Sequence, residues 1–119
     1  MTKLTTKERE IMELLWRQGP MFVRELRELY PDPKPHVNTI STFIRILEQK
    51  GYIGHRQYGN SYQYYALVTE EDYGRRSIAG IVKQYFEGSY LSAVSSFVKE
   101  EKISVDELRQ LIRQIEKGE

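Results

Sequence analysis

The sequence lacks cysteine altogether, and its 119 residues include only two histidines, His36 and His55. Disulfide bonds, thiolate metal centres and a cysteine nucleophile are therefore excluded, and we expect neither a bound metal nor another cofactor. Glycine and proline are also scarce, with 8 and 4 residues, whereas hydrophobic residues make up 39% and charged residues 29% of the chain. This composition is typical of a folded protein and excludes the collagen-like and disordered classes.

Long hydrophobic segments are missing as well. No stretch approaches the roughly 18 apolar residues that a membrane-spanning helix needs, and residues 1–7 contain no apolar signal core. We therefore expect the protein in the cytoplasm. The length suits one domain of ordinary size, or two very small ones that share a core, and it excludes a large multidomain enzyme.

Charge is nearly balanced over the chain but is unevenly distributed along it. The net charge is +1, yet residues 1–68 hold 10 Lys and Arg against 7 Asp and Glu, giving +3. Residues 69–119 hold 8 against 10, giving −2. We therefore expect the first part, and not the second, to face a polyanion.

The first part of the chain shows the pattern of three helices. Apolar residues repeat at helical spacing over about 5–17, where Thr5 and Glu8 have the spacing of a capping box, and again over about 37–49. A short second helix lies between these two segments. It is followed by residues 31–35, whose three prolines predict a tight connector.

A β-hairpin follows the three helices. Aromatic and β-compatible residues predict strands near 52–57 and 62–67, with a turn at 59–60. Three helices followed by a hairpin is the element order of a winged helix-turn-helix domain, in which the third helix enters the major groove of DNA. The predicted fold class is mainly α with a small β-hairpin: a winged helix over residues 1–68 followed by three helices over 69–119.

Three further apolar stripes at helical spacing lie in the second part, and a capping box of Ser104 and Glu107 opens the last one. About fifty residues are too few to bury three stripes independently, so the stripes need partner surface. The stripes consist of Ile78, Ile81, Val82, Tyr85, Phe86, Leu91, Val94, Val98, Leu108, Leu111, Ile112 and Ile115.

The third helix carries the residues that best suit contact with DNA. Its polar face is small and rich in hydroxyls, so a DNA backbone can approach closely, and its side chains can donate to phosphates or base edges. The helix N-terminus and the basic residues add positive charge. The candidate contacts are Asn38, Thr39, Ser41, Thr42, Arg45 and Lys50 on the helix, and His55, Arg56 and Asn60 on the hairpin.

Each of these signals has a plainer interpretation. A polar helix face can simply be solvated, and His55 can be an exposed polar contact rather than a pH switch. Tyrosines of the hairpin can stack on single-stranded nucleic acid, although in paired strands they more often pack across the hairpin or onto helices. No carboxylate pair, Gly-rich phosphate loop or nucleophile elbow indicates an enzyme.

The sequence resembles the penicillinase repressor family, the BlaI/MecI-type winged-helix repressors of penicillinase and methicillin resistance. The resemblance covers nearly the whole chain, through motifs that are individually weak but specific as a set. They are Leu4-Thr5, Glu8, Ile11-Met12, Leu15-Trp16, Val23-Arg24-Glu25-Leu26, Asn38-Thr39-Ile40, Leu47, Lys50-Gly51-Tyr52-Ile53, Tyr64 and Phe86-Glu87-Gly88-Ser89.

The resemblance implies a homodimeric repressor. The N-terminal winged helix binds one half of a dyad-symmetric operator on double-stranded DNA, and the C-terminal helices dimerise through the stripes given above. The family is derepressed by proteolysis in the C-terminal segment after a membrane sensor metallopeptidase detects a β-lactam. Here the corresponding position is Ser96-Phe97, where the family often has Asn-Phe; Phe97 can equally be a core residue of its helix.

Two further departures concern operator choice. Many members have Arg directly before Leu47, whereas this chain has Ile46 there and Arg45 one position earlier. The wing turn commonly carries Gly-Arg, and here it is Gly59-Asn60. The Cys-x-Cys pairs of the copper-responsive branch are absent. Two other functions fit the same fold: a winged-helix regulator that responds to a small ligand, and a winged-helix protein-interaction module without DNA binding.

Overall fold

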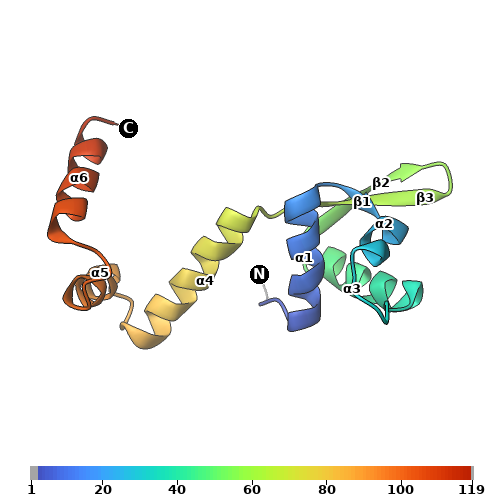
Figure 1. Ribbon diagram of the computed structural model, residues 1–119, viewed down its shortest axis with the longest axis horizontal. Coiled ribbons are helices and arrows are strands. Elements are labelled where there is room, and N and C mark those ends of the chain that lie inside the picture. Colours follow the sequence, from blue (N-terminus) through green and yellow to red (C-terminus); the bar gives the residue numbers. More distant parts are fainter. Residues whose placement is uncertain (1–2, 119) are drawn as a thin grey trace. The chain divides into compact units, whose positions relative to one another are not determined.

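The computed structural model describes residues 3–118 and divides the chain into two compact units, Met1–Gly74 and Arg75–Glu119. Figure 1 shows the order of the elements, with helices α1 to α3 and the three-stranded sheet in the first unit. The mainly helical fold with a small β-hairpin, a winged helix followed by three helices, is confirmed. Within residues 3–118, no helix combines the length and apolar character needed to cross a membrane.

Helix α1 spans Thr6–Gln18 and begins with the expected capping box. The backbone amide of Glu8 donates to the Thr5 hydroxyl at 3.3 Å, and the Thr5 amide donates to the Glu8 carboxylate at 3.0 Å. The helix ends at Gly19, which has a φ of 84° and donates its amide to the Leu15 carbonyl. Both helix ends are therefore satisfied by the residues that the sequence pattern indicated.

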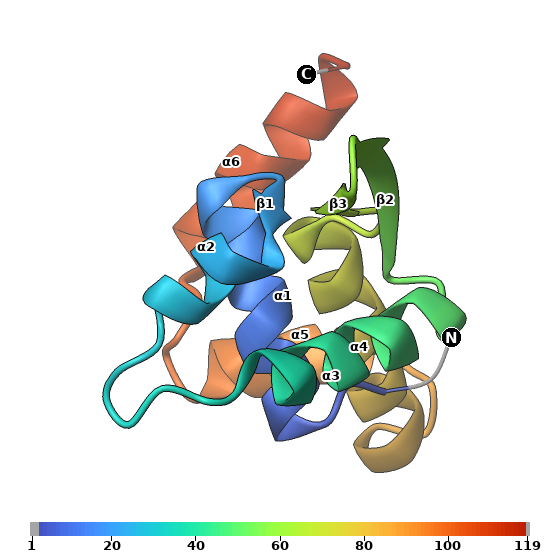
Figure 2. The ribbon, with the colours of Figure 1, turned by 90° about the vertical axis from the view of Figure 1, so that its right-hand side faces the viewer.

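The second and third helices are joined by the proline-rich connector. Helix α2 is short, Val23–Glu28, and α3 spans Val37–Gln49. The sequence pattern extends the second helix towards Tyr30, but it ends earlier because the chain turns into the prolines that follow. Figure 2 shows α3 crossing the first unit in front of α1.

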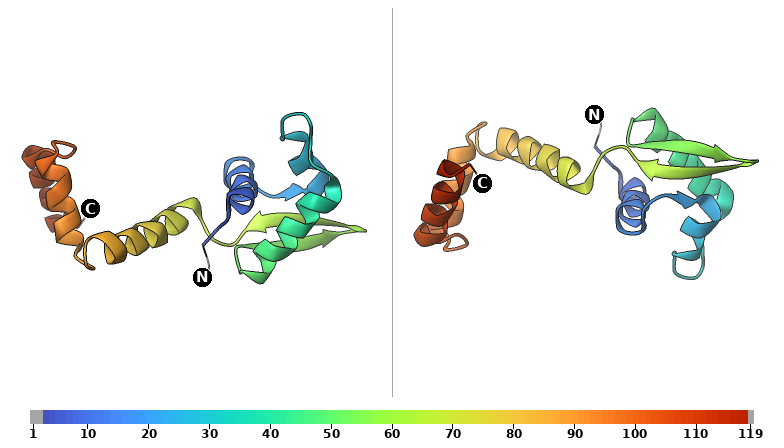
Figure 3. Two further views of the ribbon diagram at one scale, coloured as in Figure 1. Left: turned by 90° about the horizontal axis from the view of Figure 1, so that it is seen from below. Right: turned by 90° about the horizontal axis from the view of Figure 1, so that it is seen from above.

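The sheet is antiparallel, with strand order β1-β3-β2. Strands β2, Ile53–Tyr58, and β3, Ser61–Ala66, form the predicted hairpin, and Tyr58 pairs with Ser61 across a two-residue turn. Strand β1 is only Met21–Phe22 and pairs with the middle of β3. In both views of Figure 3 the hairpin extends beyond the helices of this unit, as a wing does.

The core of the first unit is formed by all three helices and by the base of the hairpin. Its largest fully buried side chains are Ile11, Met12, Leu26, Ile40, Ile44, Leu47 and Ile53. The indole N–H of Trp16 donates to the Val68 carbonyl at 2.8 Å, and its ring contacts Tyr73 at a centroid distance of 5.8 Å. The compact unit therefore includes the first turn of α4, beyond the expected boundary at residue 68.

Three helices form the remainder of the chain. Helix α4 spans Glu70–Tyr85, α5 spans Tyr90–Lys99 and α6 spans Val105–Glu116. The capping box predicted for α6 is present, because the Glu107 amide donates to the Ser104 hydroxyl at 3.0 Å and the Ser104 amide to the Glu107 carboxylate at 2.9 Å. All three predicted helical segments are thus confirmed.

Candidate nucleic-acid interface

The N-terminus of α3 is capped by a histidine. The Nδ1 atom of His36 accepts a hydrogen bond from the Asn38 backbone amide at 3.0 Å. The first turn of this helix contains no acidic residue. The positive end of the helix dipole is therefore not neutralised by a carboxylate of its own first turn, which favours an approaching phosphate.

One face of α3 is buried and the opposite face is free. Ile40, Ile44 and Leu47 are at most 1% exposed. The predicted contacts lie on the remaining surface: Asn38, Thr39, Thr42 and Arg45 are exposed, and Ser41 is half-buried. Within residues 3–118, Arg45 forms no ion pair with a carboxylate. The polar face of α3 is therefore exposed, as its helical spacing predicts, and the Arg45 guanidinium is available to a ligand.

A hydrogen bond within α3 limits which groups of the Thr42 side chain can contact a partner. Its hydroxyl donates to the Asn38 carbonyl at 2.9 Å, within the helix. The hydroxyl hydrogen is therefore already used, and the hydroxyl oxygen and the methyl group remain for a partner. A methyl group next to an acceptor suits a thymine edge.

The wing is connected to α3 through a hydrogen bond and an aromatic cluster. The His55 Nδ1 atom of β2 lies 2.5 Å from a carboxylate oxygen of Glu48, in α3. The His55 ring also contacts Tyr62 and Tyr64 of β3, at centroid distances of 4.6 and 5.8 Å. Tyrosines of the hairpin thus pack across it. These contacts of His55 connect both strands of the wing to α3.

The other two predicted wing residues are more available. Arg56 is exposed and lies over the Tyr65 ring at 5.2 Å, an arrangement that directs a guanidinium without neutralising it. Asn60 is exposed in the turn beside Gly59, whose φ of 61° favours glycine. Both side chains are exposed hydrogen-bond donors, a chemistry that suits phosphate oxygens.

Lys50 has a different environment from the one its position in the pattern suggests. Its ammonium lies 2.6 Å from the carboxylate of Glu8, which is only 3% exposed. It also donates to the Lys3 carbonyl at 3.4 Å. Burial disfavours the charged form of Glu8, but hydrogen bonds from Lys50 and Thr5 and the Lys50 charge outweigh burial and lower the pKa of Glu8. Lys50 therefore joins α1 to the end of α3.

A groove between α3 and the wing brings Ser41, a predicted contact, together with residues that the sequence pattern did not single out. It has a volume of about 690 Å³ and is lined by Ser41 of α3, by Arg24 of α2, and by Ser61 and Tyr62 of β3, among others. Tyr62 is 44% exposed. Its hydroxyls and the Arg24 guanidinium are suited to the sugar–phosphate backbone, and the Glu25 carboxylate in the same lining accepts a hydrogen bond from the Phe22 amide. No sequence signal indicates this groove, because its lining comes from α2, α3 and all three strands.

The apolar stripes of the second unit remain largely uncovered in the single chain. The structure describes all residues of α6, and none of them is buried. Val82 is the exception among the predicted interface residues, because it is 3% exposed and packs within its own chain. The exposed ones are Ile78, Ile81, Tyr85, Leu91, Leu111, Ile112 and Ile115, and the half-buried ones are Phe86, Val94, Val98 and Leu108.

The candidate cleavage position lies at the end of α5. Ser96 is half-buried, and the Phe97 side chain is 45% exposed in the single chain. The Phe97 carbonyl accepts hydrogen bonds from the Lys102 and Ile103 amides at 2.9 and 3.4 Å, which closes the C-terminal turn of this helix. Among residues 3–118, no three His, Asp or Glu side chains gather in a cluster that could hold a metal ion.

Comparison with known proteins decides the family. The sequence model of the penicillinase repressor family matches residues 4–117. The chain belongs to the penicillinase repressor family. It is similar to the methicillin resistance regulatory protein MecI of Staphylococcus aureus (strain N315), with 29% identity over 112 residues that cover 92% of this chain and 89% of that protein. The MecI protein of Mammaliicoccus sciuri is also 29% identical over 112 residues.

A second relative carries the name of the family itself. The penicillinase repressor of Bacillus licheniformis is 24% identical over 115 residues, which cover 96% of this chain and 90% of that protein. Members of the penicillinase repressor family are DNA-binding repressors, and at the level of the family this chain is a transcriptional regulator rather than an enzyme.

Proposed function

We propose that this penicillinase repressor family member binds a dyad-symmetric operator on double-stranded DNA as a homodimer. The observation that carries the proposal is the exposed polar face of α3, with Asn38, Thr39, Thr42 and Arg45, beside a wing that carries Arg56. In this arrangement α3 enters the major groove and the wing contacts the flanking backbone. Because repression requires access to promoter DNA, the protein acts in the cytoplasm.

In this proposal the second unit forms the dimer interface. Helix α6 has an apolar stripe of Leu108, Leu111, Ile112 and Ile115, and α4 adds Ile78, Ile81 and Tyr85. Each fully buried side chain of this kind contributes about 1.5–3 kcal/mol relative to an exposed one, so covering these stripes with a second copy gives a strong driving force. In the dimer the two α3 helices lie about 34 Å apart, or a multiple of that distance, and read successive half-sites.

The α3 and wing residues have different tasks in this proposal. Asn38, Thr39 and Thr42 contact base edges, and Arg45 contacts a base or a phosphate. Arg56 and Asn60 hold the flanking backbone, together with Ser41. Lys50 is assigned to joining α3 to α1 through Glu8 rather than to DNA, and His55 to positioning the wing through Glu48.

The names of two relatives support a proposal about the regulated genes. Those proteins are a methicillin resistance regulator and a penicillinase repressor. We infer that this chain represses a gene for β-lactam resistance or a related function. Proteolysis at Ser96-Phe97, triggered through a membrane sensor metallopeptidase, then relieves repression because it separates α6 from the DNA-binding unit and removes the linkage between the two half-site contacts.

Selection of genomic DNA fragments by the purified full chain tests this function. Fragments retained at moderate salt are sequenced and compared with those retained by an Arg45→Ala variant. The proposal expects one enriched motif with two inverted half-sites upstream of a gene, and a loss of enrichment in the variant. Retention without any enriched motif contradicts it.

A further inference from the structure

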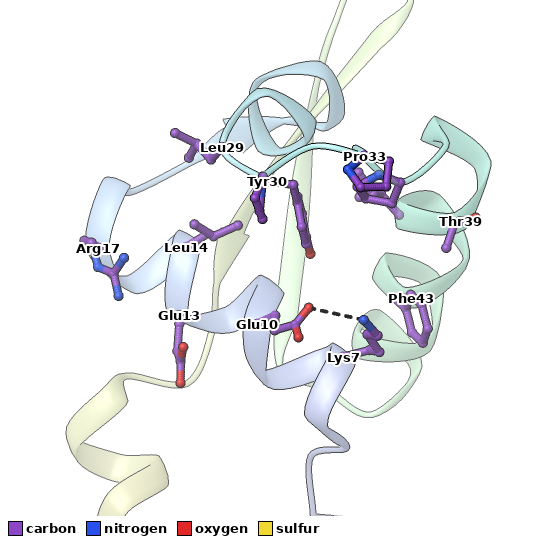
Figure 4. Close-up of a pocket in the computed structure, with 13 residues that line it drawn as sticks. Lys7, Glu10, Glu13, Leu14, Arg17, Leu29, Tyr30, Pro33, Thr39 and Phe43 are labelled. Atoms are coloured by element: carbon purple, nitrogen blue, oxygen red, sulfur yellow. Dashed lines mark ion pairs between the residues drawn. The ribbon is translucent and has the colours of Figure 1, made fainter.

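A second pocket of the first unit lies next to the candidate nucleic-acid interface. It has a volume of about 470 Å³, is open to solvent and is lined by α1, the segment 29–35 and α3 (Figure 4). This volume falls within the range of about 300–1,000 Å³ that is usual for small-molecule sites. Of the residues proposed to contact DNA, only Thr39 lies in the wall of this pocket.

The wall formed by the connector is held rigidly. Three prolines restrict the backbone of residues 31–35. At one end the Lys34 ammonium donates to the Tyr30 carbonyl at 2.6 Å and to the Glu28 carbonyl at 2.9 Å. At the other end the Arg27 Nε–H donates to the Pro35 carbonyl at 2.8 Å. Two cations therefore fix the loop from both sides, and the pocket is preformed.

The lining has an apolar body and a polar edge. Leu14, Tyr30 and Phe43 supply the apolar and aromatic surface, and all three are half-buried. Figure 4 shows the Tyr30 ring reaching into the space between α1 and α3, with the Lys7–Glu10 ion pair near its hydroxyl end. Aromatic faces and a carboxylate both attract a cation.

The ion pair between Lys7 and Glu10 is weak. The Lys7 ammonium lies 3.9 Å from the Glu10 carboxylate, and the two side chains are 67% and 40% exposed. Such an exposed pair contributes little, so another cation can replace Lys7 readily. Burial and the nearby Glu10 carboxylate both raise the pKa of Tyr30, which keeps its hydroxyl protonated and able to donate.

We propose that this pocket binds a small organic amine with an aromatic or apolar body, its ammonium at Glu10 and its body between Tyr30 and Phe43. The pocket also has Thr39 in its wall, and Thr39 is a proposed base contact. A ligand there perturbs the N-terminal half of α3, so occupancy weakens operator binding. This regulatory effect rests on the proposed function, whereas ligand binding itself does not.

The test uses three probes of similar size that differ in charge: phenethylammonium, phenethyl alcohol and phenylacetate. Each is titrated into the full-length protein without DNA while backbone amide NMR shifts are followed. The expected result is saturable shifts at Leu14, Tyr30 and Thr39 with the cation, and affinity about tenfold lower for the other two, a ratio that corresponds to one charge-assisted contact. Glu10→Gln removes this preference, whereas Glu116→Gln, outside the pocket, retains it.

Several results overturn the proposal. They are the absence of saturable shifts with every probe, equal or tighter binding of the anion, and unchanged cation preference in Glu10→Gln. The operator affinity is then measured with and without saturating phenethylammonium. An affinity that does not fall rejects the regulatory effect. Failure of the probe-free protein to bind any operator rejects the proposed function instead, so the two failures are distinguishable.

Discussion

Replacing Lys50 with Met tests whether this residue holds the third helix in place. The substitution keeps the aliphatic stem but leaves the Glu8 carboxylate, only 3% exposed, without its cation. Removing one partner of a buried ion pair costs about 3–5 kcal/mol, and because the Lys50 side chain is itself 21% exposed we expect a smaller loss, about 2–3 kcal/mol. In urea this corresponds to a midpoint lower by about 1–2 M.

The assay is urea unfolding followed by the fluorescence of Trp16, the one tryptophan in the chain. Its indole N–H is hydrogen-bonded to Val68 within the first unit, so its emission follows the unfolding of that unit. Lys7→Met is the matched control, because its pair with Glu10 is long and exposed and should change stability by less than about 0.5 kcal/mol.

The pH dependence gives an independent check on the same pair. The pKa of Glu8 is lowered in the folded protein, so its stabilising contribution is present above the ordinary value of 4.5 and is lost as pH falls through the folded-state pKa. In Lys50→Met the buried carboxyl can be protonated instead, and protonation relieves its burial cost. The stability difference between the two proteins should therefore shrink below pH 4.5.

Two results refute this reasoning. One is a variant whose stability at neutral pH equals that of the wild type. The other is a loss of stability that stays constant from neutral to acidic pH. A third readout concerns DNA: because Lys50 is engaged with Glu8, Lys50→Met should leave the salt dependence of operator binding unchanged, provided that the folded fraction is matched.

Three further predictions concern the interface and the dimer. Thr39→Ala or Arg45→Ala should weaken operator binding by about 1–3 kcal/mol if the residue contacts a base, as fluorescence anisotropy would show; unchanged affinity removes that assignment. Arg56→Ala should lower the slope of log K against log salt by about 0.9 without altering base preference, and a specificity change contradicts a phosphate contact. A chain that ends at Gly74, which keeps the packing of Tyr73 on Trp16, should fold as a monomer in sedimentation experiments; a dimeric fragment would place dimerisation in the first unit.

Periodicity and capping chemistry predicted most of the fold. Thr5 with Glu8 and Ser104 with Glu107 marked helix starts correctly, because a capping box is a local arrangement of residues three apart. The hairpin was recognisable from its turn at Gly59-Asn60. Strand β1 was not recognisable, because two residues are too few to show an alternating pattern and are ordered by pairing with β3.

The interface was partly predictable for the same reason. The polar face of α3 follows from helical spacing alone, so the exposure of Thr39 and Arg45 agrees with expectation. The ion pair of Lys50 with Glu8 links residues that lie 42 positions apart, and no local pattern contains it. The groove lined by Arg24 and Tyr62 likewise depends on how separate elements pack.

The most direct test of the central claim measures binding of the full-length protein to its own upstream DNA. Fluorescence anisotropy across a salt series compares this duplex with a scrambled duplex of equal length, and the stoichiometry is determined at saturation. The account predicts tight, sequence-dependent binding with two chains per duplex. Equally weak binding to both duplexes, or saturation with one chain per duplex, would count against it. The same result with the operator found by genomic selection would contradict it.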